Sequence, residues 1–303
     1  MTVSLLTSAA SALPRPKTAL VVDSGHDLNR MLACVLKGGG WSIQRAVDNK
    51  TVLSLARANS YDLIITGEKT SGPEDIDLLR KIRSVRPHGR LIIITDKWTR
   101  GDVVAALREQ AFSYFCRPFL LSDLADMVRQ AMAEPVWDDG IEIISATPEW
   151  VRLMAKCDLA TARRLEQFGR GIGDIPEADK DEIISAFREI LLNAIEYGAN
   201  FDPSQYVEIS YIRSTRAVAC KVKDPGQGFS LDELHHAAVS NSPQDLLRHF
   251  AVREERGLRP GGFGLLMAKK LVDDLIYSEK GNEVLLIKYL HPQGRPGQSQ
   301  VPH

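Results

Sequence analysis

Residues 179–198 read DKDEIISAFREILLNAIEYG, the most regular helical pattern in the chain. Its apolar residues recur at the 3.6-residue period and form one stripe, and acidic residues crowd the first turns. Glu189 and Asn193 are four residues apart, so they lie one above the other on the face away from this stripe. Leu192 lies among them, which indicates that something covers this face, although an ordinary solvated face would carry the same polar pair. The stripe consists of Ile183, Ile184, Phe187, Ile190, Leu191, Ala194 and Ile195.

Downstream of this helix, two alternating runs predict a β-hairpin that closes on a tight loop. The runs are VEISYI (207–212) and AVACKVKD (217–224), and the loop is DPGQGF (224–229). Asp224 can accept a hydrogen bond from an exocyclic amine, and Gly226 and Gly228 let a planar ring approach the backbone closely. A plain β-turn is the alternative for this loop taken alone.

A second glycine-rich loop, GGFG (261–264), leads into an amphipathic helix predicted over LLMAKKLVDDLIY (265–277). Free N–H groups and the positive dipole end make such a helix start favourable for phosphate, although a lone GGFG also fits a flexible turn. We interpret the polar stretch 230–260 as a mobile lid, or as a surface loop with one short helix. Two final strands, DLIYS (274–278) and NEVLLIKYL (282–290), complete the predicted sheet.

The first half of the chain alternates short β-type runs with helical stretches such as DLNRMLACVLKG and IDLLRKIRSVR. The continuous, β-branched runs DLIIT and LIIIT are typical of strands that are covered on both faces. This alternation predicts a doubly wound α/β domain with a parallel sheet, which ends near the helix SDLADMVRQAMAE (122–134). The runs are TALVV (18–22), WSIQRA (41–46), DLIIT (62–66), LIIIT (91–95) and FSYFC (112–116).

The two halves predict two domains that meet near residue 138. The run IEIIS (141–145) can form an edge strand of the second domain, and VRLMAKCDLATARRLEQFGRGI (151–172) is predicted as one or two helices. Both chain ends have the composition of flexible segments. The predicted divisions are a leader (1–16), a first domain (17–134), a second domain (135–292) and a tail (293–303).

In this order, EILLNAIEYG, DPGQGF and RPGGFGLLMAKKLVDDLIY resemble the N, G1 and G2 boxes of the gyrase, chaperone, kinase and mismatch-repair ATPase superfamily. The spacing of Glu189 and Asn193, the YG that ends the helix and the short G2 box are most similar to the bacterial anti-sigma-factor serine kinases. The resemblance covers roughly 140–290. It implies a two-layer α/β sandwich, the histidine-kinase-like or Bergerat fold, that binds ATP with Mg²⁺.

The same resemblance implies a role for each matching residue. Asn193 would hold Mg²⁺ through its side-chain oxygen, and Glu189 would be the general base for an attacking hydroxyl. Asp224 would bind the adenine amine with support from Gly226, and Gly228 would shape the ring pocket. The phosphates would lie against Gly261, Gly262 and Gly264. From its charge and its place in the sequence alone, Arg259 is expected to reach a phosphate when the lid is closed.

Residues 17–134 resemble a flavodoxin-like response-regulator receiver domain, through the strand spacing and the strings YDLIITGEKTSGPEDIDLLRKIR, LIIIT and FCRPF. Thr95 matches the hydroxyl switch residue of that family. The phospho-acceptor position falls on Gly67, the acidic pair is reduced to Asp23, and Arg117 stands at the Lys position. The resemblance therefore implies a receiver that cannot be phosphorylated in the usual way. Such a domain would serve for docking or dimerisation, or would be a vestigial scaffold.

The 303 residues carry a formal net charge of -1 with a pI of about 6.7, which argues against a general nucleic-acid or membrane-surface binder. The four cysteines are scattered singly without a CxxC pair, as in reduced cytoplasmic proteins. No apolar run approaches the ~20 residues that cross a bilayer. We therefore expect a cytoplasmic protein without direct contacts to nucleic acid or membrane.

Two functions follow from the resemblances. In the first, the chain is an ATP-dependent protein serine/threonine kinase of the anti-sigma-factor type, acting on an anti-anti-sigma (STAS) partner. In the alternative, ATP is a switching ligand of a non-catalytic module that sequesters a partner such as a sigma factor. A scaffold with both sites inactive is a third hypothesis, which the intact boxes disfavour. A homodimer is expected by analogy alone.

Overall fold

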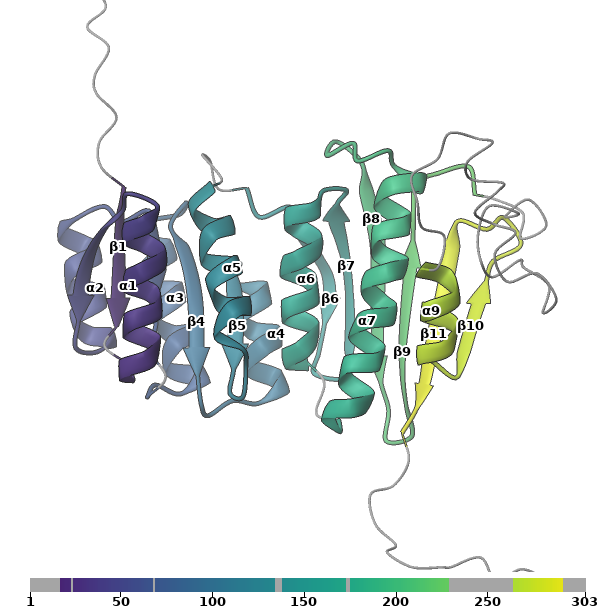
Figure 1. Ribbon diagram of the computed structural model, residues 1–303, viewed down its shortest axis with the longest axis horizontal. Coiled ribbons are helices and arrows are strands. Elements are labelled where there is room, and N and C mark those ends of the chain that lie inside the picture. Colours follow the sequence, from purple (N-terminus) through teal and green to yellow (C-terminus); the bar gives the residue numbers. More distant parts are fainter. Residues whose placement is uncertain are drawn as a thin grey trace, which may run out of the picture.

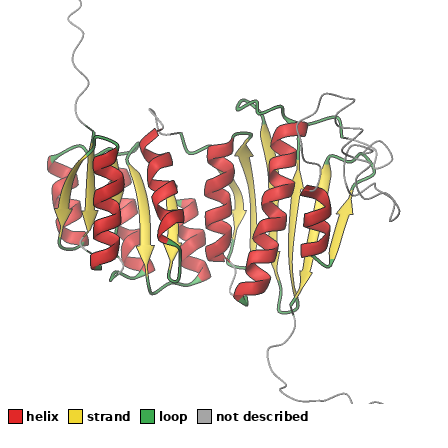
Figure 2. Ribbon diagram, in the orientation of Figure 1, coloured by secondary structure: helices red, strands yellow, loops and turns green. Residues whose placement is uncertain are grey.

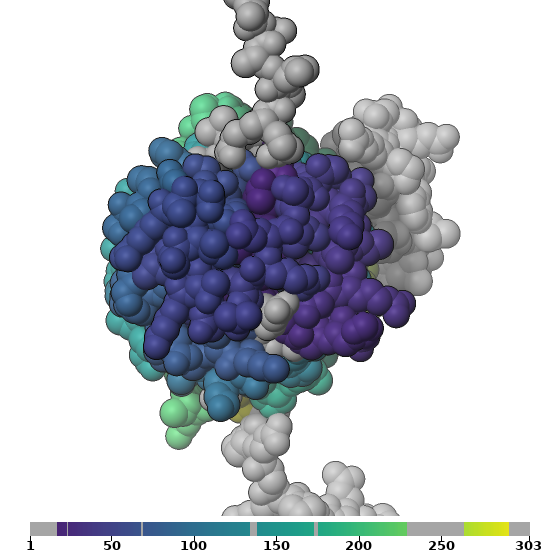
Figure 3. All heavy atoms as spheres, turned by 90° about the vertical axis from the view of Figure 1, so that its left-hand side faces the viewer, coloured from purple at the N-terminus to yellow at the C-terminus, as the bar shows by residue number. Residues whose placement is uncertain are grey.

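The computed structural model describes residues 17–22, 24–67, 69–133, 138–172, 175–228 and 264–290. These residues form two sheets with their helices, which follow one another along the long axis of the molecule (Figure 1). Viewed along that axis, the first domain covers much of the second (Figure 3). The predicted leader, lid and tail lie outside the described residues, and so do Gly261, Gly262, Arg259 and Asp23.

The first domain is a five-stranded parallel sheet in the order β2-β1-β3-β4-β5, as the alternating pattern predicts. Every residue of β4 is buried, because helices cover both faces of the sheet. This confirms the interpretation of LIIIT as a strand with two covered faces. The elements are β1 (Thr18–Val22), α1 (His26–Gly38), β2 (Ser42–Ala46), α2 (Asn49–Ala58), β3 (Leu63–Ile65), α3 (Gly72–Val85), β4 (Arg90–Thr95), α4 (Arg100–Arg108), β5 (Ser113–Cys116) and α5 (Leu121–Ala133).

The second domain is a six-stranded antiparallel sheet in the order β10-β11-β9-β8-β7-β6, with its helices on one face (Figure 2). This is the two-layer α/β sandwich that the sequence predicts, with β6 as an edge strand. The elements are β6 (Ile141–Ala146), β7 (Trp150–Lys156), α6 (Leu159–Ile172), α7 (Glu177–Asn193), the π-helical turn η1 (Ala194–Gly198), β8 (Tyr206–Arg213), β9 (Ala217–Lys223), α9 (Gly264–Leu271), β10 (Asp274–Tyr277) and β11 (Glu283–Tyr289).

Two predicted helix boundaries are wrong. Residues 150–156 form the strand β7, in which Val151, Leu153 and Ala155 alternate with less buried neighbours. No Gly or Pro separates this strand from α6, so the sequence shows one continuous run. The strand and the helix are separated at Asp158, whose carboxylate caps the start of α6 by accepting a hydrogen bond from the N–H of Thr161 at 2.7 Å. The second error is the helix predicted over 265–277, which ends at Leu271 because the residues from 274 pair with β11.

The junction between the domains is formed by α6, which packs against β5 and α4 of the first domain (Figure 1). One hydrophobic cluster runs across it and includes Val103 and Leu107 of α4 with Leu165 and Phe168 of α6. The two domains therefore share buried apolar surface.

Side chains of α6 also cover the open edge of the parallel sheet. Because β5 is an edge strand, its outward carbonyl groups have no neighbouring strand. Arg164 Nε donates to the carbonyl oxygen of Phe112 at 2.8 Å, and Gln167 Nε2 donates to that of Tyr114 at 3.1 Å. The helix thus takes the place of a further strand at this edge.

Candidate functional site

Glu189 and Asn193, on the C-terminal half of α7, face the start of α9 at Gly264. A Cβ atom placed on Gly264 would lie 2.5 Å from Glu189 Oε2 and 3.9 Å from Asn193 Nδ2. Both side chains are half-buried. The cover that Leu192 indicates for this face of α7 is therefore α9, and the missing side chain of Gly264 permits the close approach.

The end of α7 also contacts the loop after β9. The helix continues into the π-helical turn η1, a feature that often occurs at functional sites. A Cβ atom on Gly198, the last residue of η1, would lie 2.5 Å from Cβ and Cγ of Asp224. Glycine is therefore required here, because the backbone of Gly198 lies directly against the Asp224 side chain.

The loop that follows β9 is held by its own hydrogen bonds. The N–H of Gly226 donates to Asp224 Oδ1 at 2.8 Å. A Cβ atom on Gly226 would lie 2.8 Å from Asp224 Oδ1 and 2.9 Å from the carbonyl oxygen of Gly198. Burial raises the pKa of the half-buried Asp224 carboxyl, and the hydrogen bond from Gly226 opposes this effect.

The turn between β10 and β11 supports this loop from the other side. The N–H of Asp224 donates to the carbonyl oxygen of Asn282 at 3.0 Å, and Asn282 Nδ2 donates to the carbonyl oxygen of Asp224 at 3.2 Å. Gly228 has φ +80, and a Cβ atom there would collide with the carbonyl oxygen of Lys280. Sequence reasoning missed both Lys280 and Asn282, because nothing in a GN pair between two strands indicates a distant loop.

The structure thus brings five of the predicted residues to one end of α7: Glu189, Asn193, Asp224, Gly226 and Gly264. Gly228 lies in the same loop as Asp224 and Gly226, against the β10–β11 turn that also bonds to Asp224. These residues fit ATP with Mg²⁺. The half-buried carboxylate of Asp224, beside the glycine backbone, can accept a hydrogen bond from an amine. The amide of Asn193, beside the start of α9, can bind a cation that accompanies a phosphate. The described residues contain no cluster of three or more His, Cys, Asp or Glu side chains. Mg²⁺ accepts such a site, because it keeps several waters and is held by few protein ligands together with phosphate oxygens.

In the first domain, Gly67 stands at the position that the receiver resemblance gives to the phospho-acceptor. Gly67 is buried two residues after the end of β3, and glycine has no group to phosphorylate. The Thr95 hydroxyl donates to the carbonyl oxygen of Thr70 at 2.7 Å, and the Arg117 guanidinium lies 4.5 Å from the centre of the Phe119 ring.

Asp75, on α3 beside this position, is a titratable residue that sequence reasoning missed. It is 0% exposed and accepts hydrogen bonds from Asn49 Nδ2 at 2.7 Å and Thr70 Oγ1 at 2.8 Å. Burial raises its pKa to about 7, against the effect of these bonds. The signal in the sequence is its spacing, because Asp75 lies four and seven residues before the core residues Leu79 and Ile82.

Two family models match the chain. Residues 19–129 match the response regulator receiver domain, and residues 154–288 match the histidine kinase-like ATPase domain. The chain therefore combines a receiver domain with a histidine kinase-like ATPase domain, and this combination is that of a signalling regulator. In the described part of the chain, every helix is too short or too polar to cross a membrane.

Individual relatives match part of the chain. The probable transcriptional regulatory protein TcrX of Mycobacterium tuberculosis is 28% identical over 115 residues, which are 38% of this chain and 49% of that protein. The DNA-binding transcriptional regulator NtrC of Azospirillum brasilense is also 28% identical over 115 residues, 38% of this chain and 24% of that protein. The chain thus spans half or less of the length of these relatives. A solved receiver domain from Clostridium thermocellum is 26% identical with a TM-score of 0.33, covering 38% of this chain and 94% of that chain.

Proposed function

We propose that the chain binds ATP with Mg²⁺ in its second domain and acts as a protein serine/threonine kinase of the anti-sigma-factor type. Its substrate would be an anti-anti-sigma-like (STAS) partner. The main support is the position of Asn193, Asp224 and Gly264, which all lie around the end of α7 and η1. These are the residues that the three sequence boxes assign to the cation, the adenine and the phosphates.

In this proposal, Asp224 accepts a hydrogen bond from the adenine amine. Its Oδ1 is already fixed by the N–H of Gly226, so the carboxylate is held in position before the nucleotide arrives. Gly226 and Gly228 keep the loop free of side chains where the ring would approach. The phosphates would lie at the start of α9, where Gly264 is joined by Gly261 and Gly262 of the same loop.

In this proposal, Glu189 acts as the general base. Its carboxylate lies beside the helix start at Gly264, where the phosphates are proposed to bind. A partner hydroxyl would lose its proton to Glu189 while its oxygen bonds to the γ-phosphorus, and the bond to the bridging oxygen of ADP would break. When bound, Mg²⁺ would offset the negative charge of the phosphates.

The receiver domain would regulate without being phosphorylated. Gly67 offers no acceptor, and α6 contacts the receiver edge strand through Arg164 and Gln167. Partners that bind the receiver would therefore act on the ATPase domain through α6. A homodimer is a further proposal, which the oligomeric state in solution would test.

Calorimetry with ATP and Mg²⁺ tests the nucleotide site. Loss of a hydrogen bond to a charged group costs about 1.5–3 kcal/mol, so Asp224→Asn should weaken ATP binding about 10- to 100-fold. Asp181→Asn, at an exposed position of α7, is the matched control and should bind as the wild type does. Equal ATP affinity in Asp224→Asn and the wild type would show that Asp224 does not bind the adenine amine.

Phosphoryl transfer needs a second experiment. Partners captured from native cytosol with and without ATP would be incubated with γ-labelled ATP and the purified chain. Label should appear on serine or threonine of a captured partner, and Glu189→Gln should abolish the transfer while the exposed Glu149→Gln does not. Saturable ATP binding without any transfer would instead support the alternative, an ATP-switched module that sequesters a sigma-factor-like partner.

A further inference from the structure

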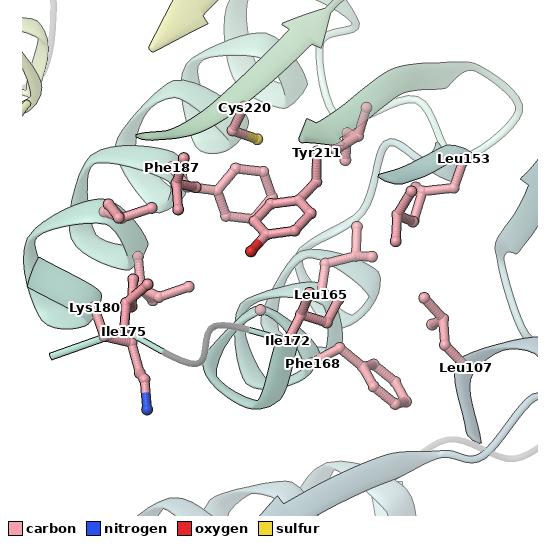
Figure 4. Close-up of a pocket in the computed structure, with 16 residues that line it drawn as sticks. Leu107, Leu153, Leu165, Phe168, Ile172, Ile175, Lys180, Phe187, Tyr211 and Cys220 are labelled. Carbon is pink, nitrogen blue, oxygen red and sulfur yellow. The ribbon is translucent and has the colours of Figure 1, made fainter. Parts of the chain in front are cut away.

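A second site candidate lies at the opposite end of α7, between α6, α7 and the sheet (Figure 4). The cavity has a volume of about 60 Å³, several times the ~10–15 Å³ that one water needs. The lining is almost entirely apolar, and Leu107 contributes to it from α4 of the receiver domain. Other lining residues are Leu165, Phe168, Phe187, Val218 and Cys220.

One polar group points into this cavity. The Tyr211 hydroxyl is directed toward its centre in Figure 4, and this buried oxygen atom has no hydrogen-bond partner among the residues that the structure describes. Burial raises the pKa of Tyr211 to about 12, so the hydroxyl stays neutral at physiological pH. Lys180, the charged residue of the lining, has its ammonium group 2.7 Å from Glu177 Oε1 and is thereby neutralised.

Water is a poor occupant of such a space. A buried water typically makes two to four hydrogen bonds, whereas this cavity offers it one hydroxyl. An unpaired buried hydroxyl is costly, so an occupant that pairs with it is favoured. A charged ligand is disfavoured, because the apolar lining has no free counter-charge.

We propose that this cavity binds a small neutral apolar molecule, about the size of one ring, that carries a single hydroxyl or carbonyl group. The apolar part would fill the space between α6 and α7, and the polar group would pair with Tyr211. The site is separate from the proposed nucleotide site, because none of Glu189, Asn193, Asp224 and Gly264 lines it. A molecule bound there would contact the receiver helix α4 and the nucleotide-binding domain together.

Phenol and benzene are the probes, because they differ by one hydroxyl. Each would be titrated into the full chain without nucleotide, with methyl chemical shifts of Ile184 and Val218 reporting on the cavity. The wild type should bind phenol more tightly than benzene. In Tyr211→Phe, phenol affinity should fall about 5-fold, as expected for one neutral hydrogen bond, and benzene affinity should hold or improve.

Val218→Ile is the second variant, because it adds one methylene to the lining while keeping a β-branched residue in β9. It should weaken both probes, and the exposed Val47→Ile should weaken neither. Failure of the wild type to bind either probe at millimolar concentration would overturn the proposal and mark the space as a packing void. Equal loss of phenol and benzene in Tyr211→Phe would overturn the role of the hydroxyl.

Discussion

Arg164 and Asp139 form an ion pair at 2.6 Å in which the two side chains are only 2% and 11% exposed. The same guanidinium donates to the carbonyl oxygens of Phe112 and Ala111, at 2.8 and 3.3 Å. One side chain therefore joins α6, the segment before β6 and the edge of the receiver sheet. Burial raises the pKa of Asp139, and Arg164 opposes this by stabilising its charged form.

Arg164→Ala should destabilise the chain by about 3–5 kcal/mol, because it leaves the buried Asp139 carboxylate without its ion-pair partner. It also leaves the carbonyl oxygen of Phe112 without this donor. Urea unfolding followed by circular dichroism measures the loss. The neighbouring Arg163 is exposed on the same helix, so Arg163→Ala should change stability by no more than about 0.5 kcal/mol. Similar losses in both variants would contradict the structural role of the pair.

The fold could be predicted because its signals are local. The β-branched run LIIIT has the composition of a strand covered on both faces, and the pattern of 179–198 gives both the buried stripe and the polar face of α7. The strand β7 was missed because WVRLMAK passes into α6 without Gly or Pro. Its alternation becomes decisive only when β6 and β8 are seen to pair on either side of it.

The candidate site was only partly predictable. Glu189 and Asn193 follow from helical spacing, and Asp224 from its place at a strand end. The support from Asn282 joins residues 58 apart in the chain, so no local pattern indicates it. The role of Arg164 could not be predicted for the same reason, because its partners are distant in the sequence and belong to the receiver sheet and to the segment before β6.

Gly198→Ala should disturb the contact between η1 and the Asp224 loop. The added methyl would lie 2.5 Å from Cβ and Cγ of Asp224, closer than carbon atoms can approach. We expect a loss of about 1–3 kcal/mol in stability, as for overpacked cores, together with weaker ATP binding. Gly38→Ala, at the end of α1 with nothing within 4 Å of the new methyl, is the control and should be neutral or slightly stabilising. Unchanged stability and ATP affinity in Gly198→Ala would show that the backbone of Gly198 does not lie directly against the Asp224 side chain.

Because of the buried Asp75 carboxyl, the free energy of unfolding should decrease as the pH rises from about 4 to about 7. Its pKa is raised to about 7 in the folded state, against 3.8 as the ordinary value. The unfolded chain therefore releases this proton first, and the stabilising contribution present below about pH 4 is lost as the pH passes through 7. At about 1.4 kcal/mol per pH unit, the upper limit is about 4 kcal/mol.

Urea unfolding at pH 5 and pH 8 checks this pH dependence. Asp75→Asn should flatten the difference between the two pH values, because the amide does not titrate. Asp77→Asn is the matched control on the same helix, with a side chain that is 57% exposed, and should keep the wild-type difference. If Asp75→Asn keeps the full difference in stability between pH 5 and pH 8, other titratable groups cause that difference.

Asn282→Ala tests the support that the β10–β11 turn gives to the Asp224 loop. Asn282 is 7% exposed, and its side-chain amide donates to the carbonyl oxygen of Asp224 at 3.2 Å. Its removal leaves that carbonyl without this donor and frees the loop to move, so we expect ATP affinity to fall about 5- to 10-fold. The exposed Glu279→Ala, in the same turn, should leave calorimetric ATP binding unchanged. If Asn282→Ala binds ATP as tightly as the wild type, the Asn282 side chain does not position Asp224.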